Sequence, residues 1–398
     1  MTNFNTEFIM ELFLEDNVST MNRLIVATAN VVNENLENIA FVNESLMKEH
    51  NLALPSISTR YSATLPVLSE EDFYNDTVKK FSQDDYYERF KMSKSTVEAL
   101  ISFLKDYVKP GSSIVPLDKK VHVFLWLLTN DVSFKEIGEL FGLHKSSVSY
   151  IFYEIATLVA EQRNQFINWP SLEEQHVTRI KVNSKYGFPN CIGFMDACRL
   201  KVGSRRRKRL KPEVILLQAV CDETLMFIDI HVGDIGTTRK GKVFRDSFMS
   251  QELKNLVDFD NHILGDSDYR LRINLITPFT SEEVVTSEEM KFNAVLWKAH
   301  SYIRQAFDIL RDRFRKLSLI DINKPEAVNT LIVAACVLHN FVLLQEGSPV
   351  KEEVVLTDEG ITIDTDIVDT AAEKRQFLCN YINYFQNSNS LLAINNIL

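Results

Sequence analysis

The sequence predicts an α/β domain preceded by an all-helical domain. Up to about residue 160, apolar residues recur at three- and four-residue spacing, which is typical of helices. Beyond about residue 190 this period gives way to short apolar runs bounded by turn residues, which are typical of strands. Long helical segments return after about residue 245. We therefore expect a mixed sheet covered by helices.

The charge is distributed unevenly along the 398 residues, whose net charge is −10. Residues 1–78 carry twelve acidic and three basic side chains, and residues 345–375 carry nine and three, so the centre is mildly basic. This pattern is compatible with a nucleic-acid surface flanked by regions that avoid it; solvated acidic tails on an unrelated core are the alternative. The predicted regions are an acidic N-terminal region (1–78), a helical domain (79–165), an α/β core (180–345) and an acidic C-terminal region (346–398).

Composition excludes several classes of protein. With 45% hydrophobic residues the chain is not a disordered one. Its five cysteines form no CxxC pair and no ligand-like spacing with the eight histidines, so neither a zinc finger nor a disulfide framework is expected. We identified no signal peptide and no apolar span of membrane length, and therefore expect no membrane partner and a nuclear location, with the cytosol as the alternative.

The helical domain is predicted from three segments, 84–108, 119–130 and 133–159, with Ser93 or Ser95 as a cap in the first. In the third segment Gly142 makes a turn and a second helix starts near Lys145. This is the pattern of a helix-turn-helix element, and a plain helical hairpin is the alternative. The second helix would present four residues outward for DNA contact: Lys145, Ser146, Ser147 and Tyr150.

The α/β core is predicted from four strand-like runs, at 191–197, 214–222, 225–232 and 261–266. Residues 222–224 should link two of them as a hairpin. Helices are expected at 246–257, 290–319 and 325–344. We expect Asp246 to cap the first of these helices, and Trp297 and His339 to be core residues.

Asp196 is the one acid in the apolar run "CIGFMDACRL". Burying an unpaired carboxylate is costly, so this side chain is either a hydrogen-bonded structural residue or part of a site. The residues that surround it must decide between the two.

Eight motifs together resemble the Harbinger-type (PIF/Harbinger) transposases and the host proteins derived from them. They occur in the family's order over about residues 84–345: "GFPNCIGFMDA" at 187–197, "QAVCD" at 218–222, "VFRDS" at 243–247, "ILGDSDYRLR" at 263–272, "LITPF" at 275–279, "FN" at 292–293, "RDRF" at 311–314 and "LHN" at 338–340. The resemblance implies an RNase H-like core of the DDE type. It also makes the hairpin at 133–159 a stronger candidate for DNA contact.

In this family three acids hold two divalent metal ions, and Asp196 and Asp266 match the first two positions. Two such ions stabilise the attacking and leaving oxygens of a phosphoryl displacement. The third acid is a glutamate on a long helix, and alignment of "HSYIRQAFDILRDRF" places Arg304 there. We expect its guanidinium to repel a metal ion and to donate hydrogen bonds to both carboxylates.

The rival hypothesis is an active Mg²⁺-dependent nuclease or transposase that uses Asp196, Asp266 and Asp308. Asp308 lies one helical turn after Arg304, on nearly the same face. Further departures favour lost catalysis, because the family's D-G-T-H is Asp196-Ala197-Cys198-Arg199 here and its H-D is Arg239-Lys240. Both changes place cations near the expected site. We therefore expect no enzymatic activity and no cofactor, with Mg²⁺ bound if the active alternative holds.

A basic run follows the first predicted strand. It corresponds to a family segment with a single Arg-Lys pair, and its cations are candidates for phosphate contact or nuclear import, with a solvated loop as the alternative. These cations are Arg205, Arg206, Arg207, Lys208, Arg209 and Lys211. The sequence thus predicts a domesticated, inactive transposase that acts as a nuclear DNA- or chromatin-associated binding or scaffold protein. The resemblance implies a Myb/SANT-like or other chromatin-complex partner, and an interaction protein with no DNA role is a third hypothesis.

Overall fold

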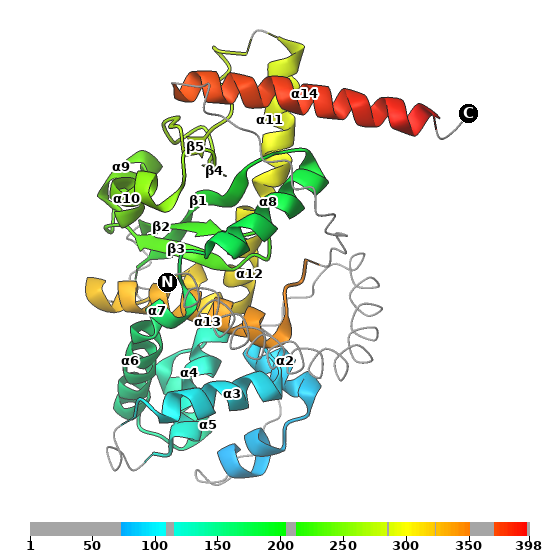
Figure 1. Ribbon diagram of the computed structural model, residues 1–398. Helices are drawn as coiled ribbons and strands as arrows, with labels where there is room; N and C mark the ends of the chain where they lie inside the picture. Colours follow the sequence, from blue (N-terminus) through cyan, green and yellow to red (C-terminus); the bar gives the residue numbers. More distant parts are fainter. Residues whose placement is uncertain are drawn as a thin grey trace, which may run out of the picture. The chain divides into compact units, whose positions relative to one another are not determined.

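The computed structural model describes residues 73–108, 115–203, 212–284, 286–322, 324–350 and 370–395 (Figure 1). They belong to one compact unit, Leu68–Leu398. The basic run 205–211, most of the acidic N-terminal region and much of the acidic C-terminal region lie outside the described residues. The predicted domain boundaries stay predictions.

The described residues between Phe73 and Tyr186 are helical, as predicted for the segments 84–108, 119–130 and 133–159, whereas the helices Arg163–Phe166 and Leu172–Tyr186 were not predicted. Its elements are η3 (Phe73–Thr77), η4 (Val78–Lys80), α2 (Gln83–Phe90), α3 (Lys94–Lys105), α4 (Leu117–Thr129), α5 (Phe134–Phe141), α6 (Lys145–Glu161), α7 (Arg163–Phe166) and α8 (Leu172–Tyr186). The predicted segment 84–108 forms two helices rather than one, because Lys91 takes a left-handed conformation (φ 58°) and ends α2. Ser93 then caps α3, since its side chain accepts a hydrogen bond from the backbone N–H of Thr96.

A mixed five-stranded sheet follows, in the order β3-β2-β1-β4-β5. Its strands are β1 (Cys191–Val202), β2 (Glu213–Cys221), β3 (Phe227–Val232), β4 (His262–Leu264) and β5 (Leu275–Ile276). β2 is antiparallel to β1 and β3, whereas β1, β4 and β5 are parallel to one another. The predicted hairpin at 222–224 is confirmed. The two-residue strand β5 was not predicted, since so short a run carries no period.

Further helices complete the chain. They are α9 (Lys240–Asp246), α10 (Phe248–Leu256), α11 (Ser287–Ala299), α12 (Ser301–Arg313), η5 (Arg315–Ser318), α13 (Pro325–Glu346) and α14 (Ala371–Asn395). The expected continuous helix 290–319 is divided at His300, whose buried ring contacts the carbonyl oxygen of Met195 at 2.9 Å. The expected cap Asp246 was wrong, because the neighbouring Ser247 caps α10.

The two faces of the sheet are covered by different helices (Figure 1). α8, α12 and α13 pack on one side, where a single hydrophobic core continues into the helical region through α6 and α4. Residues of α9 and α10, such as Phe244 and Met249, form a second cluster with Ile192 and Met195 of β1. The strands β1 and β4, which carry or precede Asp196 and Asp266, are therefore held between two packed layers.

Helix α13 is long and apolar enough by composition to cross a membrane, so the expectation that no such span exists was wrong. Its apolar window is 72% buried within the protein, as in the core helix of a soluble fold. His339 on this helix is buried and contacts the carbonyl oxygen of Leu225 at 2.9 Å, which confirms it as a core residue. Trp297 on α11 is 36% exposed, so its assignment to the core was wrong.

Candidate functional site

Asp196 and Asp266 lie next to each other because of the register between two parallel strands. Phe194 of β1 pairs with Leu264 of β4, and each acid stands two residues further along its chain. Asp196 lies within β1 and Asp266 just after the end of β4, so this register brings the two carboxylates together where β4 ends. Parallel strands thus place at one edge two acids that are 70 positions apart in the sequence.

A lysine joins the two carboxylates. The Nζ of Lys240, the first residue of α9, lies 2.6 Å from Oδ1 of Asp196 and also donates to Oδ2 of Asp266. The carboxylate of Asp268 is 3.5 Å from the same nitrogen. The lysine side chain is only 15% exposed. We call these four residues the acid–lysine cluster.

The charge state of Lys240 follows from its partners. Burial by itself lowers the pKa of a lysine, because it disfavours the charged form. Here the hydrogen bonds and negative charges of Asp196 and Asp266 outweigh burial and raise the pKa of Lys240 above its ordinary value. The ammonium group is therefore a permanent cation at neutral pH, held where two carboxylates converge.

Arg304 does not supply this cation, contrary to the sequence-based expectation. Its side chain is exposed, and its Nη2 donates to the backbone carbonyl of Trp297 at 3.1 Å, within the helix pair. The sequence has cations at 239–240, and of these Lys240 contacts the acids. The ion-pair cluster exists, but a different residue provides its positive charge.

Asp308 also makes no contact with the acid–lysine cluster among the described residues. Its exposed carboxylate pairs with Arg311 at 2.5 Å and lines a separate pocket with Gln305 and Asp312. Sequence reasoning missed the neighbouring His300, which contacts the carbonyl oxygen of Met195 in β1, next to Asp196. Burial lowers the pKa of His300, although the nearby charges of Asp196 and Asp266 oppose that effect.

The donor set was compared with what a pair of divalent metal ions requires. Mg²⁺ binds hard oxygen ligands in near-octahedral geometry. Within the described ranges no group of three or more His, Cys, Asp or Glu side chains is arranged to hold a metal ion. Two carboxylates converge instead on an ammonium group, which carries a positive charge and has no lone pair to donate. The residues present do not fit a two-metal centre.

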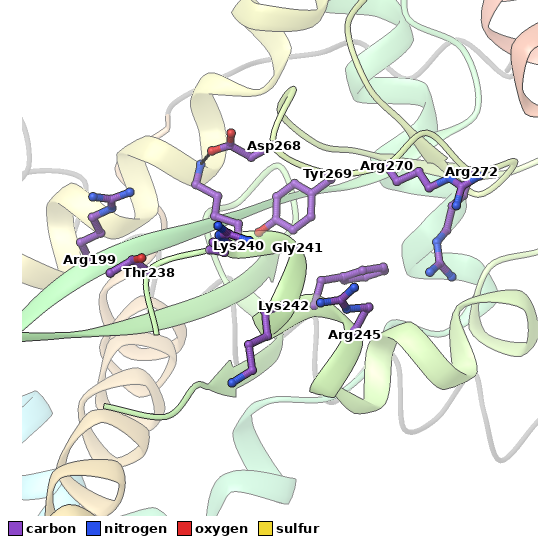
Figure 2. A pocket seen from close by; sticks show the side chains of 12 residues that line it. Arg199, Thr238, Lys240, Gly241, Lys242, Arg245, Asp268, Tyr269, Arg270 and Arg272 are labelled. Carbon is purple, nitrogen blue, oxygen red and sulfur yellow. Dashed lines mark ion pairs between the residues drawn. The ribbon is translucent and has the colours of Figure 1, made fainter. Parts of the chain in front are cut away.

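A pocket of about 550 Å³ opens beside the acid–lysine cluster (Figure 2). We call it the basic pocket. Besides Lys240, six cations line it: Arg199, Arg239, Lys242, Arg245, Arg270 and Arg272. Among the residues described, none of these six forms an ion pair with an acid. Asp268 is the one acid in the lining, and it faces Lys240. The pocket is therefore strongly positive.

Two aromatic rings form part of the pocket wall. The guanidinium of Arg272 lies 5.0 Å from the ring centroid of Phe244, a cation–π contact. Tyr269 packs edge-to-face on Phe244, with ring centroids 5.8 Å apart. Its buried hydroxyl has no hydrogen-bond partner in the described part of the chain. Burial and the charges of Asp196 and Asp266 raise the pKa of Tyr269, so the hydroxyl stays protonated and available as a donor.

The predicted helix-turn-helix segment forms two helices, α5 and α6, joined through Gly142 in a left-handed conformation (φ 63°). The first turn of α6 is exposed at Lys145 and Ser146, whereas Ser147 is half-buried. Tyr150 is 65% exposed. Further along, α6 is packed against α4 and α13. Thr157 and Glu161 are also exposed on α6, and DNA contact at its N-terminal end stays a prediction.

The α/β core is similar to proteins of known families. Residues 207–340 match the family described as DDE superfamily endonuclease. About a third of the chain is thus similar to a DDE superfamily endonuclease. Within the matched residues lie Asp266, Lys240 and Arg304, whereas Asp196 precedes them. No solved structure matches the chain.

Curated relatives of the chain come from plants and animals. It is 25% identical to protein ALP1-like of Arabidopsis thaliana, over 66% of this chain and 72% of that protein. It is 24% identical to the Arabidopsis thaliana protein named antagonist of like heterochromatin protein 1, over 69% and 77%. It is 26% identical to HARBI1 of Homo sapiens, named as a candidate nuclease, over 69% and 83%. The resemblance to Harbinger-derived nuclease-like proteins is confirmed.

Proposed function

We propose that this protein is a domesticated Harbinger-type transposase that has lost DNA cleavage and acts as a nuclear DNA- or chromatin-associated binding or scaffold protein. The proposal includes an RNase H-like core. Supporting it are the sheet order β3-β2-β1-β4-β5, with β2 antiparallel to its neighbours, and the placement of Asp196 within β1 beside Asp266, which follows β4. The DDE superfamily match supports the same core.

The observation that carries the loss of cleavage is the contact of Lys240 with both Asp196 and Asp266. Phosphoryl transfer by two metals needs divalent cations between such carboxylates. A lysine cation neutralises one of the two negative charges and engages, through its hydrogen bonds, the carboxylate oxygens that would coordinate a metal ion. It offers neither a Lewis acid nor a bound water of lowered pKa.

Binding to DNA or chromatin is supported by charge and by the relatives. The basic pocket has cations on three segments of the core, and Lys145 is exposed at the start of α6. A plant relative is named for its opposition to a heterochromatin protein. We propose nuclear location and a partner of the Myb/SANT type or another chromatin-complex protein, with the basic run 205–211 as the import or DNA-contacting segment.

The proposal is tested by DNA cleavage and DNA binding measured on the same preparations. The native chain, Asp196→Ala and Arg304→Glu are compared with Mg²⁺ or Mn²⁺ present. We expect none of them to cleave, because Lys240 still holds the carboxylates in the Arg304→Glu variant. We expect the native chain to bind duplex DNA, and Asp196→Ala to bind it at least as tightly, since that change removes a negative charge.

Asp196-dependent cleavage by the native chain would overturn the inactive reading and favour the nuclease that uses Asp196, Asp266 and Asp308. Absence of both cleavage and DNA binding would favour an interaction protein without a DNA role. Cleavage gained by a Lys240→Asp, Arg304→Glu double variant would show that these two substitutions disabled an otherwise intact frame.

A further inference from the structure

The basic pocket has more positive charge than its own acids can balance. Six cations line it in addition to Lys240, and the single acid in its wall, Asp268, faces Lys240 at 3.5 Å. Like charges gathered in one concavity repel each other and raise the local positive potential. An anion that enters the pocket relieves this repulsion, so the lining favours a negatively charged ligand.

The shape of the site favours a ligand with phosphate groups. About 550 Å³ lies within the usual range for ligand pockets. Arginine side chains present planar donor pairs that match phosphate oxygens, and Arg272 is supported from below by the ring of Phe244. In Figure 2, Arg199 and Thr238 lie to one side of Lys240, and Arg245, Arg270 and Arg272 to the other. Donors therefore lie on both sides of Lys240.

The number of charges favours a polyanion over a single small anion. A nucleic acid strand carries one negative charge per phosphate, so several consecutive phosphates are needed to balance six cations. The cations come from β1, from the segment around the start of α9 and from the loop after β4. Such a spread can follow a strand past the acid–lysine cluster.

We propose that the basic pocket binds the phosphates of a nucleic acid strand without a metal ion, with Lys240 as a fixed cation on its inner wall. This inference rests on the proposed DNA-associated function and adds to it the binding residues and the independence from metal. Lys240 neutralises charge on Asp196 and Asp266, which would otherwise repel a phosphate. The lysine thus converts an acidic edge of the sheet into one that tolerates a polyanion.

The test is binding of fluorescently labelled duplex and single-stranded DNA, measured by anisotropy in EDTA and, at matched ionic strength, in Mg²⁺. The native chain is compared with Arg245→Ala, Arg270→Ala, which removes two exposed cations of the pocket. The matched control is Lys291→Ala, Lys298→Ala, which removes two exposed cations of α11 outside the pocket lining. Both double variants change the net charge equally, so general attraction to DNA changes equally.

We expect the pocket variant to bind DNA at least roughly tenfold more weakly than the control at about 0.1 M salt, and its salt dependence to fall by about one phosphate contact per cation removed. We expect the native affinity to be the same in EDTA and in Mg²⁺. Inorganic phosphate and ATP, added as unlabelled competitors, should displace DNA only at concentrations far above that of the DNA phosphates.

Each other result overturns a defined part. Equal DNA affinities of the two double variants would disprove binding by the basic pocket and leave the proposed DNA-associated function standing. Failure of the native chain to bind DNA would disprove both the binding by the basic pocket and the proposed DNA-associated function. Binding that needs Mg²⁺ would disprove metal independence, and ATP that competes as well as DNA would identify a free nucleotide as the ligand instead of a nucleic acid.

Discussion

The ammonium nitrogen of Lys240 lies 2.6 Å from a carboxylate oxygen of Asp196, and the same nitrogen contacts Asp266. An ion pair this short and this shielded from water is a structural element as well as a chemical one. It ties the start of α9 to the middle of β1 and to the segment just after β4. The same contact explains how two adjacent carboxylates can exist side by side in a half-buried site.

We expect Lys240→Ala to destabilise the protein by about 2–3 kcal/mol, because it leaves two shielded carboxylates facing each other without a cation. The matched control is Arg304→Ala, which removes a cation from the position that alignment pairs with the family's glutamate and should change stability by less than about 0.5 kcal/mol. Urea unfolding near pH 7 measures both variants. The destabilisation of Lys240→Ala should shrink as the pH falls and the carboxylates are protonated. Equal losses in the two variants would contradict the central role of Lys240.

Removing the lysine should also change the response to metal ions. In Lys240→Ala the two carboxylates are free to accept a divalent cation, so we expect Mn²⁺ to raise its melting temperature by about 2 °C or more. The native chain should show no such shift. A second variant, Lys240→Ala, Asp196→Asn, removes one ligand and should lose the response. An Asp196-dependent shift in the native chain would mean that metal displaces the lysine.

A pH dependence is expected from Asp222 in the β2–β3 hairpin. Burial and the neighbouring charge of Glu223 raise the pKa of Asp222 from 3.8 to about 7. The folded state therefore retains a proton that the unfolded state has lost between about pH 4 and pH 7. This group's contribution to stability falls as the pH rises through that window and is constant above it.

The variant Asp222→Asn tests this dependence. Oδ1 of Asp222 accepts hydrogen bonds from Thr224 and Met226, and an asparagine oxygen can accept the same bonds. We expect the variant to be more stable than the native chain near pH 8, by up to about 2 kcal/mol, and to lose this advantage near pH 4. The control is the exposed Asp258→Asn. A difference that does not vary with pH would show that Asp222 is ionised in the folded protein.

The tight connection between α5 and α6 depends on Gly138. A Cβ at this position would lie 2.5 Å from the carbonyl oxygen of Leu143, a backbone atom that cannot turn aside. We expect Gly138→Ala to destabilise the protein by about 1–3 kcal/mol despite the better helix propensity of alanine. Gly241→Ala is the matched control, since the nearest atom to its Cβ would be 3.6 Å away. Thermal unfolding that is equal for the two variants would show that α5 and α6 can separate at little cost.

Local patterns predicted most of the elements. The segments with helical periodicity at 119–159 form helices, and the apolar runs at 191–232 form strands, as expected. One face of each such element is apolar and must be buried. The predicted helix boundaries were wrong where a single residue ends a helix. The left-handed Lys91 divides one predicted helix, and His300 divides another by reaching across to β1. Such contacts have no period in the sequence.

Residue patterns were enough to predict a mixed α/β class, the resemblance to Harbinger-type proteins, and Asp196 and Asp266 as a pair of acids. The sequence also has cations at 239–240 and 304. Only the tertiary structure decided which cation meets the acids. Arg304 bonds within its own helix pair, whereas Lys240 starts α9 beside Asp196 of β1 and Asp266, which follows β4. The physical reason is that an ion pair depends on distance in space, and the packing of helices on the sheet sets that distance.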